Sequence, residues 1–270
     1  MRLGIGSYTY TWSVGFPGAA PEHPMTALDL LERARKMDVK VVQIGPNLPL
    51  DKLCAQELTT LVQRAQQWGI ELEVGTRGVL TDHLRCWIAI AKELGASLLR
   101  SVPEVGEGIT PPSQELVQLL RDIHPDLARA GVRLALENGK IQAAQLSAIL
   151  NTVASPWIGV TLDTANSLAI SEGTEQVVRT LARHTMCLHV KDFVVQRFWH
   201  MMGFTVEGRP AGRGQMNFPW ILEQVRDAGT TANAILELWP PEQKTLHETI
   251  ALEQAWTIES VAYLRQYVLN

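Results

Sequence analysis

The chain has 270 residues, a hydrophobic content of 46% and a net charge of −4. This composition can bury a large core, which excludes a mainly disordered protein. It also gives no support for the basic face typical of nucleic-acid-binding proteins. No apolar run approaches the ~18 residues of a bilayer-spanning helix, so we expect neither a nucleic-acid nor a membrane partner. The three cysteines have no metal-type spacing, and the first residues resemble a strand rather than a signal peptide; both features indicate a cytoplasmic protein.

Short apolar runs alternate with segments of helical periodicity along the chain. Strands are predicted at residues 3–8, 39–45, 70–75, 97–102, 132–137, 158–163, 186–191 and 234–238. Helices are predicted at residues 26–37, 50–68, 81–94, 113–130, 142–153, 174–184, 219–228 and 246–269. A long loop at residues 193–216 separates the seventh strand from the next helix, and its basic side chains make it a candidate lid.

Strands that alternate with helices predict parallel βαβ units joined by right-handed crossovers. Eight such units close naturally into an α/β fold, the (β/α)₈ TIM barrel, whose usual length is about 250 residues. An open doubly wound sheet is the alternative, but no glycine-rich phosphate-binding turn follows the first strand. Because no linker or low-complexity tract divides the chain, we expect a single barrel domain over residues 1–270.

Each of the last four predicted strands carries one acid or imidazole near its carboxyl end: Glu137, Asp163, His189 and Glu237. Each residue alone is more often a structural ion-pair partner, but the carboxyl ends of barrel strands meet at one face. Several carboxylates buried together need a compensating cation. Mixed oxygen and imidazole ligation suits one divalent metal ion, Mn²⁺, Co²⁺, Mg²⁺ or Zn²⁺, and the absence of thiolates argues against a closed structural zinc site.

Four further polar residues are candidate substrate-binding groups. The guanidinium of Arg77 matches a carboxylate or phosphate with a fork of donors. Lys191 shares the face of His189 because side chains alternate along a strand. Gln43 and Asn166 lie at other strand ends. Since no phosphate-cradling loop is evident, a carboxylate-bearing substrate is at least as consistent with the sequence as a phosphorylated one.

The strand-end motifs also resemble a known family. They are Leu-Glu-Asn-Gly at 136–139, Leu-Asp-Thr-Ala-Asn at 162–166, His-Val-Lys-Asp at 189–192 and Leu-Glu at 236–237, with a Gly-Arg-Gly turn at 212–214. They are similar to the xylose-isomerase-like TIM-barrel superfamily, and within it to the sugar phosphate isomerase/epimerase group, over essentially the whole chain.

The resemblance implies a divalent ion held by Glu137, Asp163, His189 and Glu237. It also implies a catalytic role for Glu137 and Glu237, which in the family's epimerases flank the substrate and move its proton. One departure is Asn166, where those epimerases usually carry a histidine. A second is the lack of histidines at the ends of the second and third strands, which counts against the DNA-repair relatives.

We therefore predict a divalent-metal-dependent isomerase or epimerase that acts on a small oxo-sugar or oxo-sugar acid. The metal would act as a Lewis acid toward an enediolate formed when a carboxylate removes a proton. A lyase that reaches the same enolate by decarboxylating a β-oxo sugar acid is the first alternative, favoured by the basic groups and by Asn166. A non-catalytic sugar-acid-binding barrel is the second. The aromatic final helix leaves a homo-oligomer possible.

Overall fold

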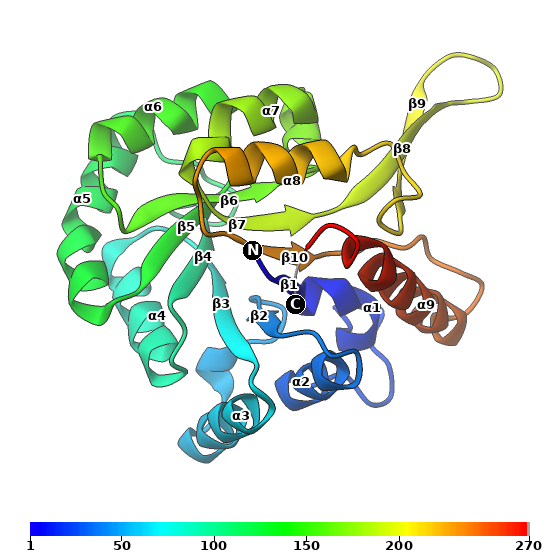
Figure 1. Ribbon diagram of the computed structural model, residues 1–270, viewed down its shortest axis with the longest axis horizontal. Helices are drawn as coiled ribbons and strands as arrows, with labels where there is room; N and C mark the ends of the chain where they lie inside the picture. Colours follow the sequence, from blue (N-terminus) through cyan, green and yellow to red (C-terminus); the bar gives the residue numbers. More distant parts are fainter. Residues whose placement is uncertain (269–270) are drawn as a thin grey trace.

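A computed structural model describes residues 1–268 and shows a closed barrel of parallel strands (Figure 1). The barrel strands are β1 (Leu3–Gly6), β2 (Val41–Ile44), β3 (Glu71–Arg77), β4 (Leu98–Val102), β5 (Arg133–Glu137), β6 (Ile158–Asp163), β7 (Thr185–Val190) and β10 (Asn233–Leu236). Their order around the barrel is β1-β10-β7-β6-β5-β4-β3-β2. The predicted (β/α)₈ barrel is confirmed.

The helices form a ring outside the barrel (Figure 1). They are α2 (Ala27–Lys36), α3 (Ala55–Trp68), α4 (Thr81–Glu93), α5 (Ser113–Ala130), α6 (Ala143–Val153), α7 (Thr174–Leu181), α8 (Phe218–Asp227) and α9 (Leu246–Leu264). Shorter helical segments are η1 (Ser7–Tyr10), α1 (Thr11–Val14), η2 (Leu50–Lys52), η3 (Asn166–Ile170) and η4 (Ala182–His184). Each long helix buries an apolar stripe; in α5 this stripe contains Leu116, Leu120, Ile123 and Leu127. Full burial of such a leucine stabilises the fold by about 1.5–3 kcal/mol.

A small apolar cluster separates the carboxyl end of the barrel from the other end. It contains Val41, Leu98, Ala135, Cys187 and Ile235, all buried. Three of these residues lie two positions before Glu137, His189 and Glu237, and residues two apart on a strand point to the same face. The alternation that directs the apolar layer inward therefore also directs the acids and the histidine inward, one layer nearer the carboxyl end.

Three predicted boundaries were wrong. Strand β1 ends at Gly6 rather than residue 8, because the side chain of Thr9 accepts a 2.8 Å hydrogen bond from the Gly6 amide and starts a 3₁₀ turn. The helix expected at 50–68 is divided, since Glu57 caps a new start by accepting from the Cys54 amide at 2.7 Å. Helix α9 ends at Leu264, and the end predicted at residue 269 lies outside the described residues.

The expected loop at 193–216 was also wrong in part, because it contains an antiparallel hairpin. Strands β8 (Asp192–Arg197) and β9 (Phe204–Arg209) pair along six residues each. Valine, threonine and phenylalanine, which favour strands, are frequent in both. Phe193, at the start of β8, is buried, but the valine, threonine and phenylalanine side chains farther along the hairpin are partly or fully exposed. In the described part of the chain, no helix is long and apolar enough to cross a membrane.

Candidate active site

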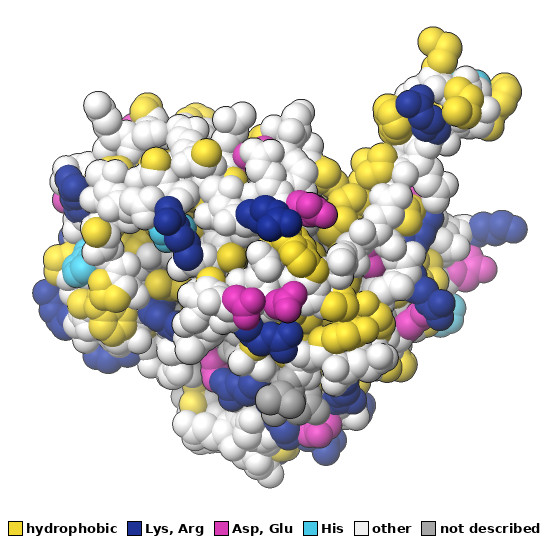
Figure 2. Space-filling view, turned by 45° about the horizontal axis from the view of Figure 1, so that its top comes forward, with side chains coloured by type: hydrophobic (Ala, Val, Ile, Leu, Met, Phe, Trp, Pro, Cys, Tyr) yellow, Lys and Arg dark blue, Asp and Glu magenta, His cyan; other side chains and the backbone are white. Residues whose placement is uncertain are grey.

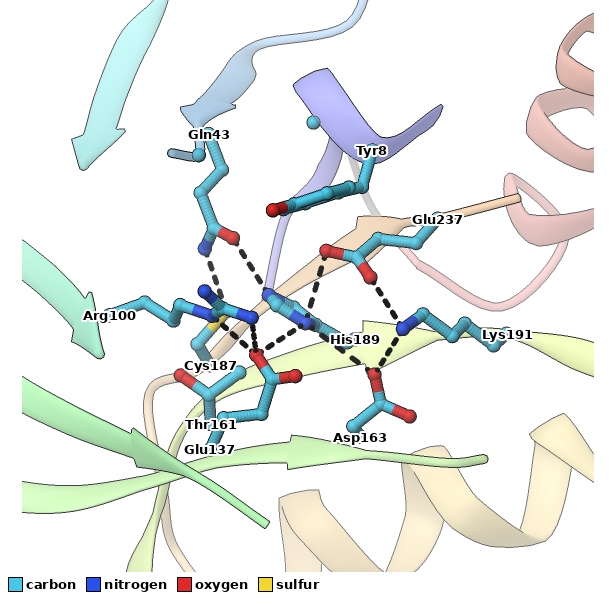
Figure 3. Close-up of polar contacts among 12 residues, drawn as sticks. Tyr8, Gln43, Arg100, Glu137, Thr161, Asp163, Cys187, His189, Lys191 and Glu237 are labelled. Carbon is cyan, nitrogen blue, oxygen red and sulfur yellow. Dashed lines mark hydrogen bonds and ion pairs between the residues drawn. The ribbon is translucent and has the colours of Figure 1, made fainter. Parts of the chain in front are cut away.

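The four predicted metal ligands converge at the carboxyl end of the barrel. Glu137 ends β5, Asp163 ends β6, His189 lies near the end of β7, and Glu237 follows β10; all are buried. The Nδ1 atom of His189 lies 3.2 Å from Glu237 Oε1, 3.4 Å from Glu137 Oε2 and 3.7 Å from Asp163 Oδ2 (Figure 3). One ligand atom from each of Glu137, Asp163 and His189 falls within a 4.8 Å cluster. The structure therefore brings together side chains from four strand ends.

The orientation of His189 is determined by residues beneath it. Gln43 Oε1 lies 2.7 Å from His189 Nε2, and Gln43 Nε2 donates to Glu73 Oε2 at 2.9 Å. Because a carboxylate only accepts hydrogen bonds, the amide nitrogen of Gln43 must face Glu73 and its oxygen must face the ring. Nε2 of His189 is then the donor, and in the neutral ring Nδ1 keeps a lone pair directed at the carboxylates. Gln43, expected to bind substrate, thus contacts a ligand from below.

The orientation of Asp163 is fixed in a similar way. Its Oδ1 accepts hydrogen bonds from the backbone amides of Ala165 and Asn166, both at 2.8 Å. This leaves Oδ2 facing the centre of the cluster. Among the described residues, Asp163 Oδ2 and His189 Nδ1 are buried polar atoms that make no hydrogen bond, and Asp163 Oδ2 has only an ion pair with the Lys191 ammonium at 2.9 Å. Such atoms are rare in folded proteins and call for an explanation. A lone pair and an anionic oxygen that face one another fit a bound cation, so the donor set fits a divalent metal ion.

Two cations occupy the remaining sides of the cluster, the buried Arg100 and the partly buried Lys191. The guanidinium of Arg100, on β4, pairs with Glu137 Oε2. The ammonium of Lys191 forms an ion pair with Asp163 Oδ2 at 2.9 Å and another with Glu237 Oε2 at 2.8 Å. Figure 3 shows Lys191 between these two carboxylates, on the opposite side of the cluster from Arg100. Each acid is therefore in contact with a cation.

These contacts shift the pKa values of the cluster. Burial lowers the pKa of His189, but Glu237, Asp163 and Glu137 outweigh burial and raise it. Burial also lowers the pKa of Lys191, and Asp163 and Glu237 reverse the effect, so that it lies above 10.5. For Asp163 and Glu237, burial raises the pKa, but the neighbouring Lys191 and His189 more than compensate, and both pKa values are lowered. The cluster thus attracts positive charge, whether as a proton or as a metal ion.

A pocket of about 270 Å³ opens onto this cluster. Its lining includes Tyr8, Arg77, Asn166, Leu238 and Trp239, together with four residues of the cluster: Arg100, Glu137, Lys191 and Glu237. Asn166 donates to Glu137 Oε1 at 2.5 Å and accepts from Lys191 at 3.2 Å, so it bridges an acid and a cation. Arg77 is half exposed at the rim, where it pairs with Glu104 at 2.7 Å. Of the four expected substrate-binding residues, the structure therefore places Arg77, Asn166 and Lys191 at the pocket.

Arg100 and Glu73 are site residues that the sequence did not assign. The sequence alone does not decide whether the Arg100 side chain points into or out of the barrel. Leu98, two positions earlier, belongs to the inward-facing apolar cluster. This parity was the available signal, because residues two apart share a face. Glu73 is buried inside the barrel, where it accepts from Gln43 and from Asn233 at 2.9 Å. No local sequence signal identifies it, since its partners are distant in the chain.

Comparisons with known proteins agree with this architecture. The sequence profile described as xylose isomerase-like TIM barrel matches residues 31–267. The 3-oxo-isoapionate decarboxylase of Pectobacterium atrosepticum is 31% identical over 265 residues, covering 98% of this chain and 95% of that protein. These matches confirm the superfamily expected from the strand-end motifs.

Solved structures show the same fold at low sequence identity. A D-psicose 3-epimerase crystallised with D-fructose has a TM-score of 0.73 and 16% identity, with complete coverage of both chains. A xylose isomerase-like TIM-barrel protein from Mycobacterium smegmatis, in complex with magnesium, has a TM-score of 0.67 and 11% identity, with 97% of each chain covered. At these identities the likeness supports the fold and leaves the reaction to be argued from the site.

Proposed function

The chain belongs to the xylose isomerase-like TIM-barrel family, and we propose that it is a divalent-metal-dependent decarboxylase of a small 3-oxo sugar acid. The observation that carries the proposal is the pairing of both candidate catalytic glutamates with cations at the pocket, Glu137 with the buried Arg100 and Glu237 with the partly buried Lys191. The 31% identity to a 3-oxo-isoapionate decarboxylase over nearly the whole chain supports the same reaction class.

The ion pairs favour decarboxylation over proton abstraction. An isomerase or epimerase needs a carboxylate that is free to remove a proton from carbon. A carboxylate that pairs with a cation has a lowered pKa and is a weaker base. Burial raises the pKa of Glu237, but His189 and Lys191 more than compensate and lower it. Loss of carbon dioxide from a β-oxo acid needs no base. It needs stabilisation of the developing enolate, and then an acid that supplies one proton to carbon.

The net charge of the site fits an anionic substrate. With neutral His189, three carboxylates face two cations, which leaves one negative charge. A divalent ion held by Glu137, Asp163, His189 and Glu237 would reverse that sign and supply Lewis-acid stabilisation for the ketone oxygen. We propose that Arg77 attracts the substrate at the rim, and that Asn166 orients its hydroxyl groups.

The chemical step balances with the groups present. The bond between the α-carbon and the carboxylate breaks, and its electron pair forms the enolate while carbon dioxide leaves. Lys191 then donates a proton to the α-carbon and later recovers one from solvent. The apolar wall of Leu238 and Trp239 would favour this step if the carboxylate faced it, because a charged group gains by becoming neutral carbon dioxide in apolar surroundings.

Isomerisation or epimerisation, the reaction predicted first from the sequence, is the second candidate. One observation favours it: Glu137 and Glu237 approach His189 from different sides, at 3.4 and 3.2 Å (Figure 3). Two carboxylates on opposite sides of a substrate could exchange protons on both faces of one carbon. The ion pairs with Arg100 and Lys191 weaken this reading.

The test uses protein loaded in turn with Mn²⁺, Co²⁺, Mg²⁺ and Zn²⁺, and 3-oxo-isoapionate in D₂O. We expect one carbon dioxide released per substrate, above the uncatalysed rate, and one deuteron on the carbon that lost the carboxylate. Replacement Lys191→Met should lower kcat by about 10²–10⁴-fold, the usual contribution of a positioned acid. Lys92→Met, at an exposed position of α4, is the matched control and should retain the wild-type rate.

The other outcomes separate the alternatives. Exchange of carbon-bound hydrogen without carbon dioxide release would establish an isomerase or epimerase. Stoichiometric metal and substrate binding with neither reaction, across a panel of 3-oxo sugar acids, would leave a binding barrel. An unchanged rate in Lys191→Met would assign the proton to another donor.

A further inference from the structure

The β8–β9 hairpin exposes an unusual amount of apolar surface. It projects sideways beyond the outline of the barrel (Figure 1), and hydrophobic side chains gather at its end (Figure 2). We call Phe198, Trp199, Met201, Met202 and Phe204 the hairpin tip. Trp199 is 92% exposed, Met202 78% and Met201 63%. Contiguous apolar surface of this kind marks an interaction site in a folded protein.

The base of the hairpin is firmly fixed to the barrel. The carboxylate of Asp192 accepts hydrogen bonds from the amides of Gly212 and Gly214, both at 2.9 Å, and of Met216 at 3.1 Å. Gly208 packs directly on Trp239, since a Cβ atom at this glycine would overlap the indole. The hairpin is thus held by a residue of the active-site pocket and starts one position after Lys191. These contacts fix the direction of the hairpin, and the tip points away from the pocket of its own chain.

The same face of the barrel carries a surface that suits the tip. Among residues 1–268, the exposed large apolar residues outside the hairpin are Phe16, Leu80, Ile109 and Trp239, together with Ile258 on α9. The first four follow β1, β3, β4 and β10, so they lie along one side of the barrel mouth. One face therefore bears both a projecting apolar arm and an apolar rim. A two-fold interface requires such self-complementarity, because the same patch contributes both partners.

A specific cavity lies on this rim. It measures about 440 Å³ and lies between the loops that follow β3 and β4, with Leu80, His83, Val105 and Glu107 in its lining. Its apolar wall suits an aromatic side chain, and the exposed Glu107 complements Arg197, which precedes the tip. A fully exposed aromatic side chain offers about 150–250 Å². Because Phe198, Trp199 and Phe204 are 41%, 92% and 58% exposed, these three side chains offer roughly 400 Å². Two such contacts, each with its counter-surface, bury about 1,600 Å², the size of a standard stable interface.

We propose that this chain forms a two-fold dimer in which the hairpin tip of each copy packs on the barrel mouth of the other. Trp199 enters the cavity beside Leu80, and the arm covers the rim of the partner's active-site pocket. Each site is then closed by the second copy, which restricts the entry of water. The association is independent of the reaction proposed above, because it depends only on the hairpin and the rim.

The experiment measures the mass of the full chain by sedimentation and light scattering over a range of concentrations. We expect a dimer for wild type, and a dimer dissociation constant at least about 30-fold higher for Trp199→Ser, the loss typical of a central aromatic anchor. Ile258→Ser, at another exposed apolar position, is the control and should remain as dimeric as wild type. Since Trp199 is almost fully exposed, its replacement should leave the thermal stability of the separated subunit unchanged.

A cross-linking experiment tests the contact itself. In a Cys54→Ser, Cys86→Ser background, which removes the exposed thiols, one protein carries Trp199→Cys and a second carries Leu80→Cys. Oxidation of the mixture should give a covalent heterodimer. A monomeric wild type at all concentrations, a dimer unaffected by Trp199→Ser, or failure to cross-link would each overturn the proposal. A monomer that co-sediments with phosphatidylglycerol vesicles through Trp199 would also overturn it and assign the tip to a lipid surface.

Discussion

Replacement of Gln43 by methionine tests whether the residues beneath His189 control the metal site. Methionine has nearly the same length as glutamine but removes the acceptor for His189 Nε2–H and the donor to Glu73 Oε2. Glu73 retains a 2.9 Å hydrogen bond from Asn233. Two buried polar groups thus lose a partner. At about 1–3 kcal/mol for each unsatisfied group, we expect the metal-free protein to lose roughly 2–6 kcal/mol of stability.

The effect on metal binding is the more specific part of this prediction. Without Gln43, the neutral ring of His189 is free to carry its proton on Nδ1, where it faces the three carboxylates, and metal binding must then displace that proton. Loss of such an outer hydrogen bond typically weakens metal affinity by about 10–100-fold, which equals roughly 1.4–2.7 kcal/mol.

The assay is competitive titration of Mn²⁺ or Zn²⁺ against a chelating dye, with urea unfolding of the metal-free protein in parallel. Gln66→Met, at an exposed position on α3, is the control and should change neither quantity measurably. A folded Gln43→Met protein with wild-type metal affinity would refute the reasoning, because His189 would then be oriented without Gln43.

Three further outcomes are expected. A divalent ion at 100 times its dissociation constant should stabilise the protein by about 2.7 kcal/mol, which raises Tm by roughly 5–10 °C in a chain of this size; calorimetry should show no such shift in His189→Ala. Replacement Arg100→Met leaves the buried Glu137 without its cation, so the metal-free protein should lose about 3–5 kcal/mol of stability in urea unfolding. Added metal should then stabilise the variant by more than it stabilises the wild type. Burial lowers the pKa of His83 and of His184 below 6.5; the unfolded chain therefore binds more protons there, and stability falls as the pH drops through 6.5 toward the folded values. On acidification, the Tm of the double variant His83→Gln, His184→Gln should fall by less than the Tm of wild type. An equal fall would contradict the attribution of this pH dependence to the two histidines.

The barrel and the four-residue cluster could be predicted because both follow from local alternation. Ala135 and Glu137 share one face of β5, as Cys187 and His189 share one face of β7, whichever strands lie beside them. Once the strands are parallel, their carboxyl ends meet, and the acids and histidine converge. Only the fold class was needed to infer that residues up to a hundred positions apart in the chain converge.

The partners within the cluster could not be predicted in the same way. The alternation of side chains along a strand assigns Gln43 and Arg100 to the barrel interior. It does not predict how far along the barrel axis a long side chain places its polar group. Gln43 therefore lies under His189, where the sequence suggested a substrate contact, and Arg100 reaches Glu137 across the β4–β5 pair. The starts of α2 and α3 depend on side-chain caps at Thr26 and Cys54. Such caps shift a helix boundary by a few residues without changing the apolar periodicity.

The hairpin was missed for a different reason. Its two strands pair with each other, and Asp192 fixes their base. The carboxylate of Asp192 accepts hydrogen bonds from the amides of Gly214 and Met216, which lie more than twenty positions later in the chain. Apolar side chains in residues 198–204 would ordinarily indicate a buried segment, yet the structure exposes them (Figure 2). Clustered apolar side chains usually lie buried, so their exposure here is explained if another surface covers them. The exposure of Trp199 therefore supports the proposed interface, and the close contact of Gly208 with Trp239 connects that interface to the pocket that it is proposed to close.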